Sequence, residues 1–281
     1  MINYKTYLKQ FHLTGICGLI VLLCFFGFNK NVLAQEYTLI TKIDTVAKLA
    51  SVDNFGNLFV VTPQNELLKF NTSGKLLWNY SNRTYGEISQ LDVTDPLRVI
   101  LYYADFQQIV VLNNNLSEIA KFNYNNNPDV QITLIASANN NGYWVYDQIN
   151  RELRRVSNSF LDDIKTGNIY QRNGFDMHAN FMLTDDSQIY INDTTAGVRI
   201  FDRYGNFIKT AVVYPKNDFT VLDNEIYFTQ NNSLLAYNYL TFKQRTIALP
   251  NETVFKKAIL RFNRLIVLTE KDLTLWAVKK N

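Results

Sequence analysis

His178 is the residue that we consider first, because its type could support catalysis or metal binding. It is the only histidine after residue 34, and both cysteines, Cys17 and Cys24, come before that point. A zinc site at His178 would need carboxylates as its other ligands, which is uncommon. A Ser-His-Asp triad would need His178 as its base, and no Gly-x-Ser-x-Gly nucleophile elbow accompanies it. The sequence therefore predicts no catalytic residue, no metal ligand and no cofactor, and it leaves His178 as a candidate for recognition.

Paired carboxylates are the second group that could do chemistry. They could hold calcium or divide the roles of general acid and base. Each pair is expected at the end of a strand, beside Asn, Ser, Thr or Pro, where turn formation explains it. No Asp-x-Asp-x-Asp-Gly loop is present, so we interpret these residues as turn formers. The pairs are Asp92 with Asp95, Asp162 with Asp163, and Asp185 with Asp186.

The elements that position these residues are short β-strands. The stretch Ser187–Thr210 predicts three of them, at Ile189–Ile191, Val198–Phe201 and Phe207–Thr210. β-branched and aromatic runs bounded by Gly, Asn and Asp are typical of hairpins. On this interpretation the polar residues Asp193, Asp202 and Arg203 are turn residues of one repeat rather than a site.

The same pattern occurs six times along the chain. The second strand of each unit aligns best, and its first residues lie 41, 44, 46, 37 and 39 positions apart. A period near 40 without helical patterning predicts the blades of a propeller. The six second strands are Leu58–Val60, Val99–Leu101, Tyr143–Val145, Ile189–Ile191, Ile226–Phe228 and Leu265–Val267.

In five of the six units, the third strand ends at a residue that is expected to form a turn. Asn, Asp and Ser serve there because their side chains can bond their own backbone at the reversal. These residues are Asn71, Asn113, Ser157, Asp202 and Asn238.

The ends of the chain predict how the ring closes. The sixth unit stops at Lys279–Asn281 before it can make a fourth strand, whereas the strand Tyr37–Ile43 has no unit of its own. The N-terminal strand would complete the last blade and remove an exposed sheet edge. We therefore predict an all-β fold, a closed six-bladed β-propeller of four-stranded blades.

The repeats resemble the six-bladed propellers of the TolB-like, NHL and YWTD group over residues 37–280. The segment Tyr143–Asp147 is similar to the Tyr-Trp-Thr-Asp motif without matching it. The resemblance implies architecture and little about function. Lactonases and other hydrolases of this architecture hold a metal in the central channel with side chains from different blades. Here the entry strands offer Asp53, Asp92 and Asp223 but no Glu-Gly-Pro-like motif, so a metal-dependent hydrolase stays an alternative.

Residues 1–34 predict a secretory signal peptide, which leaves 35–281 as a single propeller domain. Lys5 and Lys9 precede the apolar run Leu13–Phe28, and Val32–Ala34 ends in the small residue of a cleavage site. Cleavage would lower Lys plus Arg from 28 to 25, equal to the 25 Asp plus Glu, and would remove every thiol. The residue before each cysteine is too large for a lipobox, so we do not expect a lipoprotein anchor. We expect a periplasmic or secreted protein with no membrane insertion after cleavage and no affinity for nucleic acid.

The remaining candidate is a surface for recognition. The connectors between blades and the turns between second and third strands are expected on one face, which is rich in Tyr and Arg, residue types enriched at binding hot spots. We predict an exported, monomeric, non-catalytic module that binds or scaffolds a protein or peptide in the bacterial cell envelope. A propeller that binds a glycan or small ligand is a further alternative. The predicted binding residues are Arg83, Tyr85, Phe106, Tyr124, Tyr170, Arg172, His178 and Tyr214.

Overall fold

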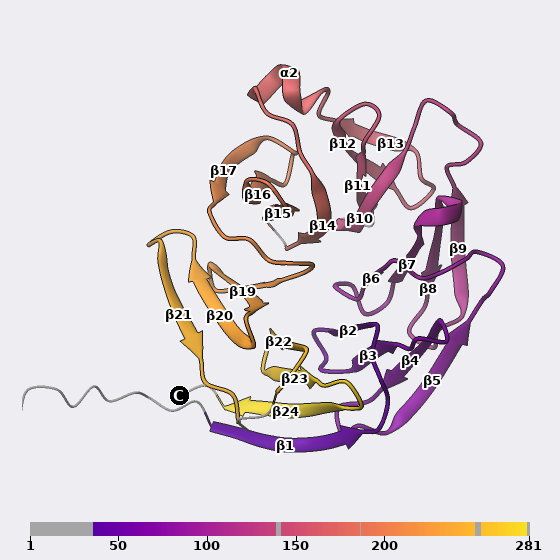
Figure 1. Cartoon of the computed structure of the whole chain (residues 1–281). Helices are drawn as coiled ribbons and strands as arrows, with labels where there is room; N and C mark the ends of the chain where they lie inside the picture. The colour runs from indigo at the N-terminus through magenta and orange to yellow at the C-terminus, as the bar shows by residue number, and fades with distance from the viewer. Residues whose placement is uncertain (1–35, 139–141, 186, 251–253, 280–281) are drawn as a thin grey trace, which may run out of the picture. The chain divides into compact units, whose positions relative to one another are not determined.

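The computed structural model describes residues 36–138, 142–185, 187–250 and 254–279. The predicted signal peptide lies outside these residues, as does Asp186. The described residues form six antiparallel sheets of four strands each, arranged as the blades of a propeller (Figure 1). No helix among them is long and apolar enough to cross a membrane.

Each blade uses four strands, and in the first five blades they follow chain order from the centre of the ring outward. The first blade is β2 (Leu49–Val52), β3 (Leu58–Val61), β4 (Glu66–Phe70) and β5 (Leu76–Ser81); the second is β6 (Gln90–Asp92), β7 (Val99–Tyr103), β8 (Gln108–Leu112) and β9 (Glu118–Asn123). The third is β10 (Ile132–Ala138), β11 (Gly142–Asp147), β12 (Glu152–Ser157) and β13 (Asp162–Lys165); the fourth is β14 (Ala179–Thr184), β15 (Gln188–Asp193), β16 (Gly197–Asp202) and β17 (Phe207–Ala211). The fifth is β18 (Thr220–Leu222), β19 (Glu225–Gln230), β20 (Ser233–Asn238) and β21 (Lys243–Ile247).

The sixth blade joins the two ends of the described chain. It contains β22 (Lys257–Arg261), β23 (Arg264–Leu268) and β24 (Leu273–Lys279), and its outer strand is β1 (Glu36–Ile43). β1 pairs antiparallel with β24, with Tyr37 opposite Val278 and Ile43 opposite Leu273. The prediction that the N-terminal strand closes the ring is confirmed.

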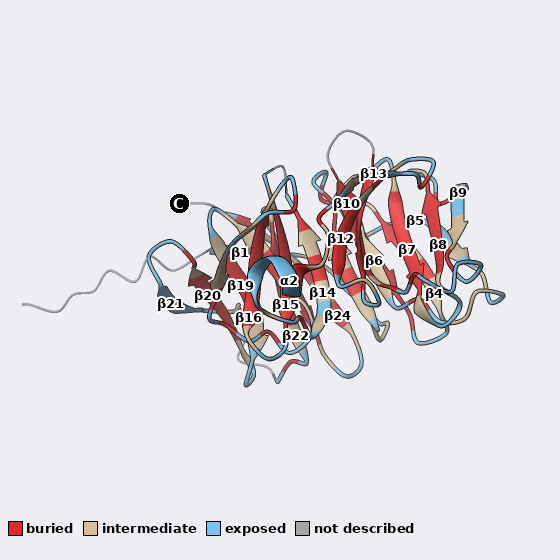
Figure 2. Ribbon diagram, turned by 90° about the horizontal axis from the view of Figure 1, so that it is seen from above, coloured by how far each residue is buried: buried red, intermediate tan, exposed pale blue. Residues whose placement is uncertain are grey.

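The core lies between the blades rather than in one central layer. Six clusters of buried side chains each combine residues of two adjacent blades. The second strands β3, β7 and β11 are buried along their whole length, because neighbouring blades cover both of their faces (Figure 2). Strands buried on both faces are near-continuous apolar runs, which is why the six predicted triplets identified them correctly.

The turns after the third strands form as predicted. Asn71 Oδ1 accepts hydrogen bonds from the backbone N–H groups of Ser73 (3.0 Å) and Lys75 (2.9 Å). Asp202 Oδ1 accepts in the same way from Tyr204 (2.8 Å) and Asn206 (2.9 Å). Asn113, Ser157 and Asn238 accept equivalent bonds in the other blades.

The antiparallel order of the strands gives the ring two faces. The connectors between blades and the turns between second and third strands share one, which we call the connector face. The turns between first and second strands and between third and fourth strands share the other, which we call the opposite face. The connector between the third and fourth blades contains a short helix, α2 (Ile169–Asn173), and the turn between β7 and β8 contains the 3-10 helix η1 (Ala104–Phe106).

Candidate functional site

Three of the predicted binding residues lie together at the second blade. Arg83 and Tyr85 belong to the connector from β5 to β6, and Phe106 ends η1 in the turn that faces it. The ring of Tyr85 meets Tyr103 edge-on at 5.5 Å between centroids. A Cβ atom at Gly86 would lie 3.0 Å from the ring of Phe106, so this glycine permits the close approach of connector and turn. Phe106 remains 48% exposed, and Arg83 is also exposed.

The structure corrects the prediction that Tyr124 is exposed on the binding face. Its side chain is only 8% exposed and packs edge-on against Phe122 in the core between the second and third blades. Burial raises the pKa of the Tyr124 hydroxyl well above its usual range. The residue follows β9 directly, and the position of its ring depends on the neighbouring blade rather than on the local pattern. Tyr124 therefore contributes to packing and offers no exposed contact area.

The connector between the third and fourth blades carries three more predicted residues, and it is held firmly. The side chain of Asn168 caps α2 by accepting a hydrogen bond from the Gln171 N–H. Arg172 donates to the backbone oxygen of Thr166 (2.5 Å) and to Asn206 Oδ1 (3.2 Å). Because Asn206 belongs to the opposite-face turn of the next blade, the Arg172 guanidinium joins two blades at the rim. Arg172 is thus occupied in holding the connector.

Tyr170 and His178 remain exposed on this connector. Tyr170 is 51% exposed, and the guanidinium of Arg151 lies 5.9 Å from the centre of its ring. The backbone of His178 is fixed, because its carbonyl oxygen accepts from the Thr194 N–H at 3.1 Å. Its ring Nδ1 lies 3.5 Å from Thr195 Oγ1. No carboxylate orients the ring of His178 in the hydrogen bonds of the described residues, so the histidine offers an exposed polar edge.

Asp193 is more than the turn residue that the sequence predicts. Its carboxylate is fully buried, and Oδ2 accepts from Arg199 Nε at 2.8 Å. Burial acts to raise the pKa of Asp193, but hydrogen bonds from Arg199 and Thr195 outweigh it and hold the pKa below its usual range. Arg199 in turn lies 3.6 Å above the centre of the Phe175 ring.

The third blade repeats this arrangement. Asp147 is fully buried and accepts from Arg154 Nη2 at 2.5 Å. In both blades the aspartate ends the second strand, the arginine lies in the third strand, and the carboxylate also accepts a backbone N–H of the incoming connector, from Gln131 in one case and His178 in the other. An Asp followed six or seven residues later by an Arg was a signal for these pairs in the sequence, although it was not recognised.

Tyr214 lies apart from both groups, on the connector from β17 to β18. It is 48% exposed. Its connector is fixed by Asn192 Nδ2, which donates to the backbone oxygen of Pro215 at 2.9 Å, and by Asn180 Nδ2, which donates to that of Lys216 at 3.2 Å. The exposed predicted residues thus form three groups on the connector face, at the second blade, between the third and fourth blades, and after the fourth blade.

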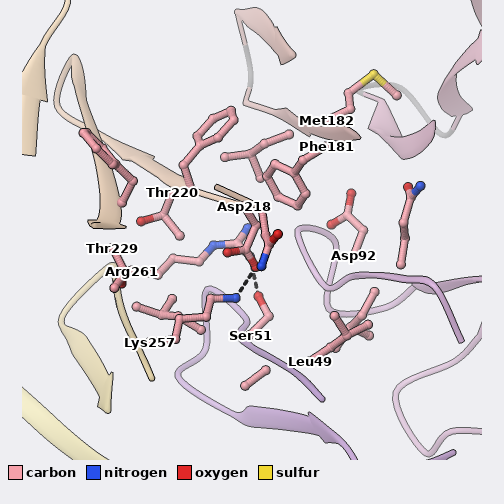
Figure 3. A pocket seen from close by; sticks show the side chains of 18 of the residues that line it. Leu49, Ser51, Asp92, Phe181, Met182, Asp218, Thr220, Thr229, Lys257 and Arg261 are labelled. Atoms are coloured by element: carbon pink, nitrogen blue, oxygen red, sulfur yellow. Dashed lines mark hydrogen bonds and ion pairs between the residues drawn. The ribbon is translucent and has the colours of Figure 1, made fainter. Parts of the chain in front are cut away.

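The centre of the ring contains a cavity of about 270 Å³, which we call the channel cavity. The first strands of all six blades contribute to its lining (Figure 3). Phe181, Met182 and Leu49 supply apolar walls, and an ion pair between Lys257 and Asp218 lies within it.

Arg261 connects three blades beside the channel cavity. It leaves β22 of the sixth blade and donates to Ser51 Oγ in the first blade and to Thr94 Oγ1 after β6 of the second, each at 2.9 Å. Burial lowers the pKa of the guanidinium, and the nearby charges of Asp92 and Asp53 oppose that shift. No pattern of spacing within the sequence indicated this role, because the three partners are far apart along the chain.

The three aspartates that could have been ligands of a metal in the central channel make separate contacts instead. Asp53 Oδ1 accepts the N–H groups of Phe55 and Asn57, and Asp92 accepts those of Thr94 and Ser137. Asp223 lies in the turn between β18 and β19. Across residues 36–138, 142–185, 187–250 and 254–279, no group of three or more His, Asp or Glu side chains is placed to hold a metal ion.

The fold and its connectors define the class of the protein, which is a six-bladed β-propeller closed by its N-terminal strand. No protein-family model matches the chain, and no curated protein matches it in sequence.

Many solved structures share the fold. One is a catalytically inactive variant of virginiamycin B lyase from Staphylococcus aureus with quinupristin, at a TM-score of 0.58 and 12% identity over 86% of this chain and 99% of the lyase. Another is the WD40 domain of Pan2 from Neurospora crassa, at 0.54 and 8% identity over 87% and 96%. A third is BamB from Moraxella catarrhalis, at 0.49 and 11% identity over 82% and 84%. At such identities the likeness shows the fold alone, and the BamB likeness, with a TM-score under 0.5, supports no argument.

Proposed function

We propose that this protein is an exported, non-catalytic binding module of the bacterial cell envelope, and that it docks a protein or peptide on its connector face. One observation carries the proposal. Three aromatic side chains, Phe106, Tyr170 and Tyr214, are each about half exposed on this face, at 48%, 51% and 48%. Aromatic residues supply large contact area with few rotatable bonds and are enriched at binding hot spots.

The connectors that present these residues are fixed before any partner binds. The cap of α2 and the Arg172 bridge hold the backbone on both sides of Tyr170, and the hydrogen bonds from Asn180 and Asn192 hold the two residues that follow Tyr214. A surface that is ordered in advance loses less conformational entropy on binding. The predicted export signal in residues 1–34 supports placement in the envelope.

Affinity capture from the envelope fraction of the native host, under mild chemical cross-linking, tests the proposal. The intact protein should recover a partner in a stoichiometric amount. A triple variant, Phe106→Ala with Tyr170→Ala and Tyr214→Ala, should recover at least tenfold less, because truncated hot-spot residues commonly cost about 2 kcal/mol each.

A matched triple variant on the opposite face is the control. It combines Leu161→Ala, Tyr204→Ala and Phe242→Ala, whose side chains are 69%, 55% and 69% exposed. Recovery should stay at the level of the intact protein. Repeated recovery of the protein alone, or equal loss in both triple variants, would contradict docking on the connector face.

Binding of a small polar ligand or glycan in the channel cavity is a second candidate function. The observation that favours it is the cavity itself, which combines apolar walls with the Lys257–Asp218 ion pair. A ligand that binds only the folded state stabilises it by RT ln(1 + [L]/Kd), so the melting temperature rises as the ligand concentration exceeds Kd. A sugar and metabolite panel should therefore contain a stabilising compound whose effect Lys257→Met abolishes, and flat melting curves would reject this candidate.

A further inference from the structure

The outer strand of the first blade, β5, differs from the other five outer strands in its charge. Its sequence, Leu-Leu-Trp-Asn-Tyr-Ser, contains no charged residue. Each of the other five, β1, β9, β13, β17 and β21, contains at least one Lys, Arg, Asp or Glu. Charged side chains on edge strands discourage the addition of another strand, and β5 lacks this protection.

β5 is also exposed and apolar. Leu76, Leu77 and Trp78 follow one another, and they are 50%, 41% and 47% exposed. A register shift in the pairing with β4, between the positions opposite Leu76 and Trp78, interrupts the usual alternation of buried and exposed side chains. β5 ends its sheet and pairs only with β4, so its outer backbone groups face away from the blade. An exposed apolar sheet edge is a template for an added strand.

Exposed apolar residues also lie on both neighbouring outer strands. Thr41 of β1 contacts the turn that leads into β5, since a Cβ atom at Gly74 would lie 2.2 Å from its Cγ2. At the other end the Tyr80 hydroxyl donates to Glu118 of β9 at 2.7 Å. Leu39 of β1 is 49% exposed and Ile119 of β9 is 54% exposed. The three strands follow one another along the rim (Figure 1), and we call their exposed apolar residues the rim belt.

We propose that the rim belt binds an extended, uncharged, apolar segment of another protein, which adds to β5 as a fifth strand of the first blade. Backbone hydrogen bonds would give affinity, and the exposed leucines and Trp78 would select apolar side chains. The strands β1, β5 and β9, which carry the rim belt, follow the curve of the ring over three blades (Figure 1). A flexible segment can follow that curve, whereas a second convex ring would meet it at one blade only. The proposal concerns a different surface from the connector face and does not depend on it.

A defined peptide tests the proposal on the purified protein. The probe is a short capped peptide that alternates threonine with valine, and its charged counterpart has lysine in place of each valine. Amide hydrogen exchange is followed by mass spectrometry with and without each peptide. We expect the uncharged peptide to slow exchange in β5 at least tenfold, without effect on the other five outer strands. The charged peptide should leave β5 unchanged.

Two variants locate the effect. Trp78→Lys and Leu76→Lys each place a charge on β5 and should weaken the uncharged peptide at least tenfold. Ile208→Lys is the matched control, because Ile208 is 45% exposed on the outer strand β17, which already contains Lys209. This control should bind as the intact protein does. Far-UV circular dichroism and a cooperative melt establish that each variant is folded.

Three results would overturn the proposal. The first is unchanged exchange in β5 at saturating peptide. The second is equal protection of several outer strands, which would mean that any sheet edge suffices. The third is protection of β5 that rises with protein concentration in the absence of peptide, together with a dimer in light scattering, because β5 would then pair with a second copy of the chain.

Discussion

The centre of the ring and the connector face use their polar and aromatic side chains in different ways. In the centre, the Arg261 guanidinium donates hydrogen bonds to Ser51 and Thr94, and the Lys257 ammonium forms an ion pair with Asp218. On the connector face, Phe106 and Tyr170 remain about half exposed. The charged side chains of Arg261 and Lys257 thus hold adjacent blades together, and exposed aromatic contact area lies on the connector face. The contrast supports the proposal that the connector face binds a partner.

Asp193→Ala is the change expected to cost the most stability. It leaves Arg199 buried, 8% exposed, without its carboxylate. Removing one partner of a buried pair typically lowers the free energy of unfolding by about 3–5 kcal/mol. Urea denaturation measures the loss. Asp202→Ala, which removes a carboxylate from an exposed turn, should cost only about 1 kcal/mol. Equal losses would show that Asp193 acts as a turn residue alone.

Arg261→Gln should cost about 2 kcal/mol, because two hydroxyl groups lose a charged donor. Thermal and urea denaturation both report this loss. The control is Lys256→Gln, which removes an exposed partner of Glu270 and should cost about 0.5 kcal/mol or less. If Arg261→Gln left stability unchanged, the guanidinium would be free for a ligand, and the contrast between centre and surface would break down.

A smaller effect is expected on the acid side of the stability profile. The pKa of Asp193 is depressed in the folded protein, so its contribution is complete above the pKa of an unfolded aspartate, about 3.9. The contribution decreases as the pH falls from there through the folded pKa. Melting temperatures between pH 7 and pH 3 should fall less steeply for Asp193→Asn than for the intact protein. Parallel profiles would contradict the role of the ion pair.

The smallest effect on stability is expected on the connector face. Phe106→Ala, Tyr170→Ala and Tyr214→Ala should each change the free energy of unfolding by no more than about 0.5 kcal/mol, since exposed substitutions rarely do more. Urea denaturation of the single variants measures this. A loss above 2 kcal/mol at any of them would mean that the side chain supports the ring, and it would then no longer count as uncommitted contact area.

Local patterns in the sequence predicted the fold well and the site less well. The six apolar triplets, the turn residues after the third strands and the closing strand were all identified correctly, because each depends on strand periodicity or on a side chain bonding its own backbone. Tyr124 was expected on the surface and is buried. Arg172 is exposed as expected, and its guanidinium also bridges two blades. Both findings depend on contacts between blades, which local patterns do not encode.

By itself, the sequence determined the position of the strands and the residues that turn the chain, since these features depend on near neighbours in the sequence. The number of blades followed from the repetition of that pattern every 37 to 46 positions. Only the tertiary structure decided which side chains are exposed and which are engaged in contacts between blades. Arg261 meets Ser51 and Thr94 across 210 and 167 positions of the chain. Such contacts exist only once the ring has closed and brought the first strands of all six blades to its centre.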